Sequence, residues 1–377
     1  MKLTTKGRVA VLRAPGEGFE LQSYVVPDPE PGAIVVKVSL AGICGSDLHG
    51  WRGDLGSKAP WGAAHQGAGV TQGHEMTGRI FRLGKGVTQD ALGTPLREGD
   101  RICHNLSLNC FHCQDCVRGL YNLCPNLRGL FRPAGEWPYF TGTFADYYYI
   151  PPMHFVYRVP DELSDEIVAP VNCAMSAVMQ GLTSAGMLAG EPVVIQGAGG
   201  LGLAATAIAK DRGAHPIIVL DRVEERLRLA KEFGADHTIS VQAFLTPADR
   251  IEHVRNLTMG VGASLIVELV GLAELLPEGI AMLRSGGTFL EIGNMVWGRT
   301  VAFDPSSILM GKRILGSAGS QPWVIPKVFE FLLKNRNRFP FEKMLSHKYK
   351  LQEIDEAFRQ ADWASRNTSV VRACLVP

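Results

Sequence analysis

Short apolar runs separated by turn residues fill about the first 160 residues of the chain. The runs RVAVLR (8–13) and AIVVKVSLAGI (33–43) are rich in Val and Ile, and the segment PDPEPG (27–32) lies between them. Runs of β-branched residues bounded by Pro and Gly are typical of strands. The pattern therefore predicts a twisted, partly closed antiparallel sheet with long loops in this half of the chain.

Near residue 190 the pattern changes to apolar strands that alternate with helical stretches. The segment RVEERLRLAKEFG (222–234) has apolar residues at three- and four-residue spacing, and Gly234 follows where a helix would end. Alternation on this scale predicts a parallel sheet with helices on both faces. More helix follows from about residue 325, before the strand-like end VVRACLVP (370–377).

Length and composition restrict the classes of function. A chain of 377 residues predicts two domains, and the net charge of +1 gives no sign of a nucleic-acid or anionic-membrane surface. The first 18 residues contain no apolar core, and Gln196 interrupts the apolar stretch 193–209. We therefore expect no signal peptide, no membrane span and a reducing cytoplasmic location, where clustered cysteines more often bind metal than form disulfides.

The glycine-rich segment GAGGLG lies between a predicted strand and a predicted helix, and it fits the pattern G-x-G-x-x-G. In this setting the first Gly allows a tight turn, the second lets the main chain approach a pyrophosphate, and the third lets helix and strand pack closely. A glycine turn that merely packs the helix is the alternative. The residues expected to hold the dinucleotide are Gly197, Gly199, Gly200, Leu201 and Gly202.

Asp221 ends the next predicted strand, 19 residues after Gly202. A carboxylate in this position accepts hydrogen bonds from the adenosine ribose and repels a 2′-phosphate, which favours NAD over NADP. Arg222 follows immediately and could instead bind a 2′-phosphate.

Four cysteines lie close together in the segment CFHCQDCVRGLYNLC (110–124), with the spacing C-x2-C-x2-C-x7-C. Four thiolates close a tetrahedral zinc site and leave no position for substrate, so we predict a structural zinc ion. A disulfide cluster and a nucleic-acid-binding zinc module are alternatives, although the surrounding sequence is not strongly basic. The predicted ligands are Cys110, Cys113, Cys116 and Cys124.

Other metal-binding residue types are scattered along the chain. The segment AGICGSDLHG (41–50) supplies Cys44, TQGHEMTG (71–78) supplies His74, and APVNCAMSAV (169–178) supplies Cys173. Their spacing alone cannot assemble them into one site.

These motifs together resemble the zinc-dependent medium-chain alcohol dehydrogenase family over nearly the full chain. The resemblance depends on GICGSDLH, GHE, the four-cysteine run, Cys173, GAGGLG with Asp221, and VVRACLVP. It implies an α/β protein with a GroES-like, β-rich catalytic domain and a Rossmann coenzyme domain built on a doubly wound parallel sheet. The implied boundaries are 1–176 for the catalytic domain with both zinc sites, 177–325 for the NAD-binding domain, and 326–377 for a return to the catalytic domain.

By the same resemblance, Cys44, His74 and Cys173 bind a catalytic zinc ion and leave a fourth position for water or a substrate oxygen. This brings the expected zinc content to two ions per chain. Two thiolates neutralise the charge of the ion, which can still lower the pKa of a bound alcohol.

The resemblance also implies roles for the residues around that zinc ion. Asp47 would orient the imidazole of His74, and Ser46 would take the alcohol proton and pass it through the nicotinamide ribose to His49. Glu75 would either approach the zinc ion during ligand exchange or be a buried, paired acid.

Two arginines complete the implied coenzyme site. Arg226 would contact the adenosine ribose and Arg372 the pyrophosphate, although both could instead be solvated surface residues. Gly45 stands where many relatives carry a phosphate-binding basic residue, which suggests faster coenzyme release. The long segment 50–73, with Trp51, Trp61 and His65 among its bulky residues, is expected to border the catalytic cleft.

The favoured function is a zinc- and NAD-dependent dehydrogenase of a hydrophobic, secondary or cyclic alcohol, in a homodimer or homotetramer. Phe131, Trp137, Tyr139 and Phe140 could line an apolar pocket or fill the core. Alternatives are a polyol dehydrogenase of the same family, a zinc-free quinone or enoyl reductase, and a non-enzymatic NAD-binding zinc protein. The presence of Cys173, where polyol-type relatives often have a nearby glutamate, counts against the polyol alternative.

Overall fold

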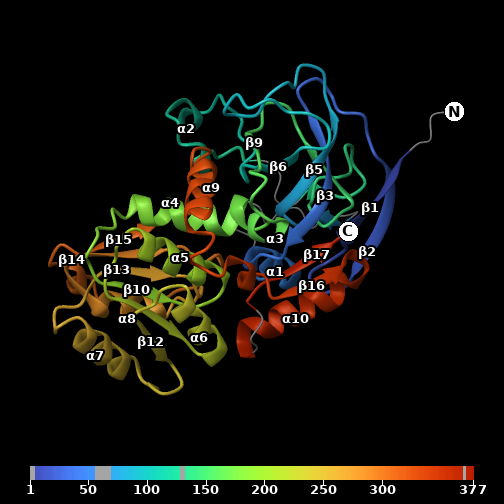
Figure 1. The fold of residues 1–377 in the computed structure, drawn as a ribbon. Coiled ribbons are helices and arrows are strands. Elements are labelled where there is room, and N and C mark those ends of the chain that lie inside the picture. Colours follow the sequence, from blue (N-terminus) through green and yellow to red (C-terminus); the bar gives the residue numbers. More distant parts are fainter. Residues whose placement is uncertain (1–4, 56–68, 128–131, 368–370) are drawn as a thin grey trace.

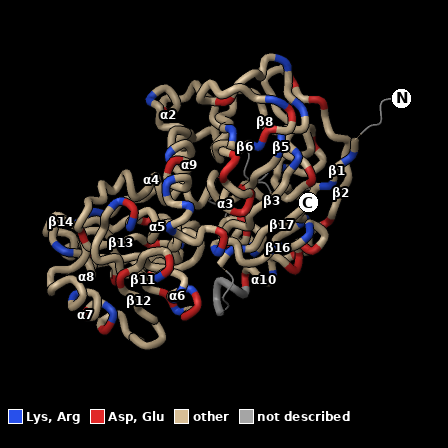
Figure 2. Tube along the Cα trace, in the orientation of Figure 1, with Lys and Arg blue, Asp and Glu red and all other residues tan. Residues whose placement is uncertain are grey.

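The fold is described from a computed structural model of residues 1–377, in which residues 5–55, 69–127, 132–367 and 371–377 are described. Two lobes lie side by side, and the helices α4 and α9 lie where they meet (Figure 1). Acidic and basic residues are interspersed along both lobes, in agreement with the net charge of +1 (Figure 2). Within the described ranges, no helix is long and apolar enough to cross a membrane.

The first lobe contains two largely antiparallel sheets, where the apolar runs separated by turn residues predicted one antiparallel sheet. Buried β-branched residues of the longest strands, such as Val36 and Val38, pack in its core. The larger sheet has the order β16-β17-β3-β5-β6-β9, with β8 paired to β3, and the smaller has the order β2-β1-β4-β7. The strands are β1 (Lys6–Leu12), β2 (Phe19–Val25), β3 (Ile34–Gly42), β4 (Val70–Thr71), β5 (Glu75–Leu83), β6 (Arg101–His104), β7 (Arg132–Pro133), β8 (Tyr147–Ile150), β9 (Val156–Arg158), β16 (His347–Lys350) and β17 (Ala373–Val376).

The second lobe is a six-stranded parallel sheet of order β12-β11-β10-β13-β14-β15 with helices on both faces. The strand order reverses next to β10, and ligands of such sheets bind outside the carboxyl ends of the strands at that point. The strands are β10 (Val193–Gln196), β11 (Ile217–Asp221), β12 (His237–Ser240), β13 (Ala263–Glu268), β14 (Leu283–Glu291) and β15 (Arg313–Gly316). Its helices are α5 (Gly200–Asp211), α6 (Glu224–Glu232), α7 (Pro247–Leu257) and α8 (Leu275–Met282).

Two helices connect the lobes. A π-helical turn at Val171–Met175 leads into α4 (Ser176–Ser184), and α9 (Val324–Asn335) carries the chain back after β15. The predicted boundary at 176 coincides with the start of α4, and the one at 325 falls inside α9, so the domain division stays a prediction. The remaining helices are α1 (Gly45–Arg52), α2 (Gln114–Val117), α3 (Asp165–Val168) and α10 (Ile354–Asn367).

Two carboxyl groups meet at the ends of the neighbouring strands β13 and β14, where Glu268 pairs in register with Glu291. Glu268 is fully buried, and one of its oxygens accepts hydrogen bonds from the backbone N–H groups of Val270 (2.7 Å) and Gly271 (2.8 Å). Burial, followed by the charge of Glu291, raises the pKa of Glu268 to about 8. The carboxyl group therefore carries a proton at neutral pH.

This raised pKa predicts a loss of stability at alkaline pH. Because the folded pKa exceeds the unfolded value of 4.5, the stabilising effect is complete below that value and is lost as the pH rises through about 8. Glu268→Gln keeps a carbonyl acceptor and a neutral side chain. Between pH about 6 and about 9, we expect its melting temperature to fall a few degrees less than that of the wild type. Equal decreases in both proteins would contradict the assignment.

Candidate active site and metal centres

Cys44 and Asp47 are held together at the start of α1. Cys44 occupies the N-cap position, and its backbone N–H donates a hydrogen bond of 2.9 Å to Oδ2 of Asp47. The other oxygen of Asp47 lies 3.2 Å from Nδ1 of His74. One buried carboxylate thus fixes the backbone of Cys44 and the imidazole ring of His74, as the sequence predicted for His74.

Cys44, His74 and Cys173 converge although they are far apart in the sequence. Their ligand atoms and a carboxylate oxygen of Glu75 all lie within 4.8 Å of one another. The sulfur atoms of Cys44 and Cys173 are 3.9 Å apart, close to the edge of about 3.8 Å that a tetrahedral zinc–thiolate site requires. Donor type and spacing therefore fit a zinc ion held by two sulfurs and one imidazole nitrogen.

Three different elements carry these ligands. Cys44 follows β3, His74 precedes β5, and Cys173 lies in the π-helical turn before α4. The side-chain amide of Asn172 donates a hydrogen bond of 2.7 Å to the carbonyl oxygen of His74 and so ties the last two elements together. No local motif marks Asn172, because this contact exists only in the folded chain.

Glu75 and Arg372 connect the metal centre to the glycine loop. Glu75 is buried and accepts a hydrogen bond from the guanidinium group of Arg372, which is itself 6% exposed. A Cβ atom on Gly200 would lie 3.1 Å from Nε of Arg372. Glu75 is therefore a buried, paired acid that also belongs to the metal-binding group. Arg372 is buried beside the loop where it was expected to meet the pyrophosphate.

Ser46 and His49 lie on α1, directly after the first ligand. Ser46 is in the first turn and is partly exposed. Nδ1 of His49 lies 2.7 Å from Oδ1 of Asp54, and the guanidinium group of Arg52 is close to the same nitrogen at 3.0 Å. The carboxylate of Asp54 orients the imidazole of His49. Because His49 is partly exposed, its imidazole can exchange a proton with solvent.

A groove of about 410 Å³ runs from Gly45 across the glycine loop to the second lobe. Gly197 has φ of +100°, and a Cβ atom on Gly202 would lie 1.9 Å from the carbonyl oxygen of Gly197. Both positions therefore require glycine, for the reasons expected from the sequence. Among the residues that the structure describes, no atom beyond Gly199 and its chain neighbours lies within 4 Å of a Cβ atom placed on Gly199, so the main chain is open to a ligand there.

Asp221 lines the same groove and is hydrogen-bonded to the glycine loop. Its Oδ2 accepts a hydrogen bond of 2.7 Å from the N–H of Ala198, and its Oδ1 accepts one of 2.8 Å from Val223. Arg222 and Arg226 also line the groove, and burial lowers the pKa of Arg226. A carboxylate and two guanidinium groups therefore surround the expected position of the adenosine ribose.

Sequence reasoning missed a second ion pair in this groove. Arg250 on α7 forms a bidentate pair with Glu278 on α8, with bonds of 2.8 and 2.7 Å, and both side chains are nearly buried. The two residues are on separate helices, and no local motif marks them.

The four cysteines of residues 110–124 lie in a projecting segment that includes α2 (Figure 1). Their sulfur atoms lie within 4.8 Å of one another, with separations of 3.6 to 4.0 Å between the closest pairs. These distances again match the edge of about 3.8 Å expected for tetrahedral zinc–sulfur coordination. The group therefore fits a closed, structural zinc ion held by Cys110, Cys113, Cys116 and Cys124.

Removing this group is expected to remove one zinc ion and to destabilise the chain. Substituting Cys110 and Cys113 together by Ser leaves two thiolates, which are too few to hold the ion and order the loop. We expect the zinc content to fall from about two to about one per chain, with a lower melting temperature. Cys103→Ala, which removes a buried cysteine outside both groups, is the control. Two zinc ions in the double variant would contradict the assignment.

The aromatic residues that could line an apolar pocket pack instead against other rings and core residues of the first lobe. Phe140 is fully buried in a core cluster with β1 and β3 residues, Tyr139 stacks on Tyr24, and Trp137 packs edge-on against Tyr149. Phe140 therefore fills the core of the first lobe and Tyr139 packs against that core, as the alternative interpretation held, whereas 49% of the surface of Trp137 is exposed. Phe131, Trp61 and His65 lie outside the described residues.

Two family models cover most of the chain. An alcohol dehydrogenase GroES-like domain matches residues 30–161, and a zinc-binding dehydrogenase domain matches residues 200–334. The 5-exo-hydroxycamphor dehydrogenase of Pseudomonas putida is 31% identical over 90% of this chain and 92% of its own length. The chain belongs to the zinc-dependent medium-chain dehydrogenase family. It is an oxidoreductase that acts on alcohols, as the sequence predicted.

Further members of this medium-chain dehydrogenase family have similar sequences and folds. The L-threonine 3-dehydrogenase of Pyrococcus horikoshii is 29% identical over 93% of this chain and 94% of its own length. An alcohol dehydrogenase from Thermotoga maritima superposes with a TM-score of 0.89 at 28% identity, covering 99% of this chain and all of that one. A zinc-binding dehydrogenase structure from Sinorhizobium meliloti, bound to NADP, superposes with a TM-score of 0.82 at 26% identity. The match covers 99% of this chain and all of that one.

Proposed function

We propose that this dehydrogenase oxidises a hydrophobic secondary or cyclic alcohol to its ketone, reversibly, with NAD. The observation that carries the proposal is the convergence of Cys44, His74 and Cys173 next to the groove that contains the glycine loop. With Glu75 paired to Arg372, the three ligands leave a tetrahedral zinc ion one open position, which distinguishes a catalytic site from a closed structural one.

The bound groups and the chain have separate tasks. Zinc, when bound, supplies a Lewis acid that polarises the substrate oxygen, and NAD supplies the hydride acceptor. Asp47 keeps His74 in its ligand orientation, and Ser46 takes the proton of the substrate hydroxyl. His49, oriented by Asp54, transfers that proton to solvent. Arg372 and the N–H groups at the start of α5 hold the pyrophosphate.

Two relatives bear on the substrate class. The relative from Pseudomonas putida is named for hydroxycamphor, which is a cyclic secondary alcohol, and its match extends over 90% of this chain. A sorbitol dehydrogenase of Halalkalibacterium halodurans, 30% identical over 93% of this chain, keeps a polyol as the second candidate.

A substrate panel tests the proposal. Zinc-loaded protein is assayed for NAD and NADP reduction with borneol, cyclohexanol, 1-hexanol, sorbitol and L-threonine. We expect kcat/KM to be highest for a cyclic secondary alcohol with NAD. If kcat/KM were highest for sorbitol, the substrate would be a polyol and not a hydrophobic alcohol. A folded, two-zinc protein that reduces neither coenzyme with any of these compounds would contradict the proposed function.

The proton path gives a separate prediction. His49→Gln removes the group that transfers the proton to solvent, and general acid–base groups contribute about 10² to 10⁴ in rate. We expect kcat for alcohol oxidation to fall by about tenfold or more near neutral pH, with a smaller loss at alkaline pH and unchanged zinc content. His215→Gln removes a histidine paired with Asp236 outside the site and serves as the control. An unaltered pH profile of kcat in His49→Gln would exclude this role.

The coenzyme preference and the assembly remain part of the proposal. Asp221 favours NAD, whereas Arg222 and Arg226 could bind a 2′-phosphate. A homodimer or homotetramer, expected from the sequence, is tested by light scattering.

A further inference from the structure

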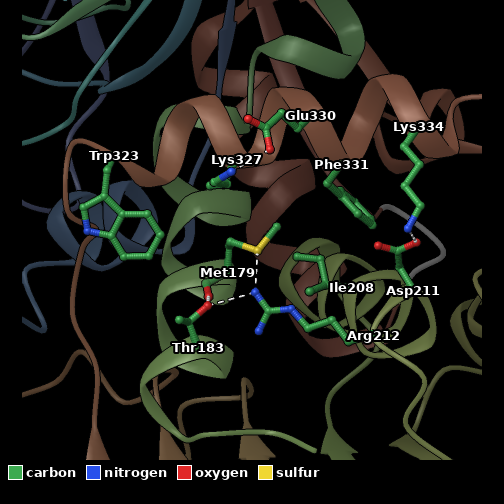
Figure 3. A pocket seen from close by; sticks show the side chains of 10 residues that line it. All are labelled: Met179, Thr183, Ile208, Asp211, Arg212, Trp323, Lys327, Glu330, Phe331 and Lys334. Atoms are coloured by element: carbon green, nitrogen blue, oxygen red, sulfur yellow. Dashed lines mark hydrogen bonds and ion pairs between the residues drawn. The ribbon is translucent and has the colours of Figure 1, made fainter. Parts of the chain in front are cut away.

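A second groove lies between the helices α4, α5 and α9 and has a volume of about 390 Å³ (Figure 3). It shares no lining residue with the coenzyme groove. Two of its helices, α4 and α9, are those that connect the lobes, and α4 begins directly after the turn that carries Cys173. The groove is therefore a separate cavity next to the connections between the lobes.

The groove has an apolar part and a charged part. Met179, Ile208 and Phe331 are each at least nine-tenths buried and contribute side chains from the three different helices. Trp323, which caps α9, stands at one end with 49% of its surface exposed. These side chains and the exposed indole of Trp323 form an apolar contact for one part of a small ligand.

A single guanidinium group dominates the polar part of the groove. Arg212 follows α5, and its Nη2 donates hydrogen bonds of 2.8 Å to Sδ of Met179 and 2.8 Å to Oγ1 of Thr183. Within the described ranges, no carboxylate lies within ion-pair distance of Arg212. Burial lowers the pKa of Arg212, and the charge of Asp211, which itself pairs with Lys334, only partly offsets this effect. A half-buried cation held by a thioether and a hydroxyl is poorly compensated.

The other charged residues of the groove have partners. Nζ of Lys334 lies 2.7 Å from Asp211, and Nζ of Lys327 lies 2.8 Å from Glu330. These four charges cancel, and the net positive charge of the lining is that of Arg212.

We propose that this groove binds a small organic carboxylate with an apolar or aromatic body. A guanidinium fork matches the two oxygens of a carboxylate, and the walls take up the remainder of the molecule. A volume of about 390 Å³ is at the lower end of the range for ligand sites, so the occupant is small. The inference does not depend on the proposed dehydrogenase reaction.

The test is a calorimetric titration of the purified protein with benzoate, with benzyl alcohol as the uncharged probe of the same shape. Arg212→Met removes the cation but keeps an unbranched side chain, and Arg212→Lys keeps the charge without the fork. Arg338→Met is the matched control, because Arg338 pairs with Asp211 but does not line the groove. Cys44→Ser tests whether benzoate binds at the proposed metal centre instead. Thermal melting verifies that each variant is folded.

We expect saturable benzoate binding that weakens by about tenfold or more in Arg212→Met, weakens less in Arg212→Lys, and is unchanged in Arg338→Met and Cys44→Ser. Benzyl alcohol should bind much more weakly than benzoate in this titration. Absence of saturable binding, equal affinity in folded Arg212→Met, or loss of binding in Cys44→Ser would each overturn the proposal. A change of oligomeric state in Arg212→Met without a change in benzoate affinity would overturn it as well.

Discussion

Cys44→Ala and His74→Ala are each expected to lower alcohol turnover by at least about a thousand-fold, because either change breaks the ligand set proposed to activate the substrate oxygen. The zinc content should fall from about two to about one per chain, since two protein ligands hold the ion poorly. The four-cysteine site is in a different segment and should keep its ion. Melting temperature, zinc analysis and turnover are measured on the same preparations.

The matched control for these variants is Cys103→Ala. Cys103 is as buried as Cys44 but belongs to neither metal-binding group among the described residues. This variant should keep two zinc ions and most of its activity. Turnover that persists in a one-zinc Cys44→Ala protein would place the chemistry elsewhere.

Asp221→Ser is expected to shift the ratio of kcat/KM for NAD to that for NADP by about tenfold or more toward NADP. The substitution removes the negative charge that repels a 2′-phosphate, and Arg222 and Arg226 remain in the same groove. Because Asp221 also accepts hydrogen bonds from Ala198 and Val223, we expect a loss in overall coenzyme affinity as well.

Two further variants separate these effects. Asp221→Asn keeps a carbonyl acceptor but no charge, and should show the shift in preference with a smaller loss of affinity. Asp304→Ser, which changes an acid outside the groove, should alter neither. If the ratio of kcat/KM for NAD to that for NADP were unchanged in both Asp221 variants, Asp221 would not determine the coenzyme preference.

The local motifs could be interpreted from the sequence alone. The glycine loop and the four cysteines lie within short segments, so spacing was enough to predict the elements around Gly197 and the grouping of Cys110 with Cys124. The alternation of strands and helices likewise predicted the parallel sheet with helices on both faces. In each case the relevant physics acts between near neighbours in the chain.

The proposed catalytic centre could not be assembled in this way. Cys44, His74 and Cys173 meet only because β3, β5 and the turn before α4 pack together, and family resemblance supplied what spacing could not. The pairing of Glu75 with Arg372 spans 297 residues and has no local signal. The aromatic residues illustrate the same limit, because composition alone does not distinguish a ring that lines a cleft from Phe140, which fills the core.

The most direct test of the account is the fate of the carbinol hydrogen. Zinc-loaded wild-type protein is incubated with NAD and a cyclic secondary alcohol carrying deuterium on the carbinol carbon, and the reduced coenzyme is examined by mass spectrometry. Direct hydride transfer beside the proposed zinc centre predicts reduced coenzyme that carries the deuterium. Reduced coenzyme without deuterium, or equal label transfer by the one-zinc Cys44→Ala variant, would contradict the account.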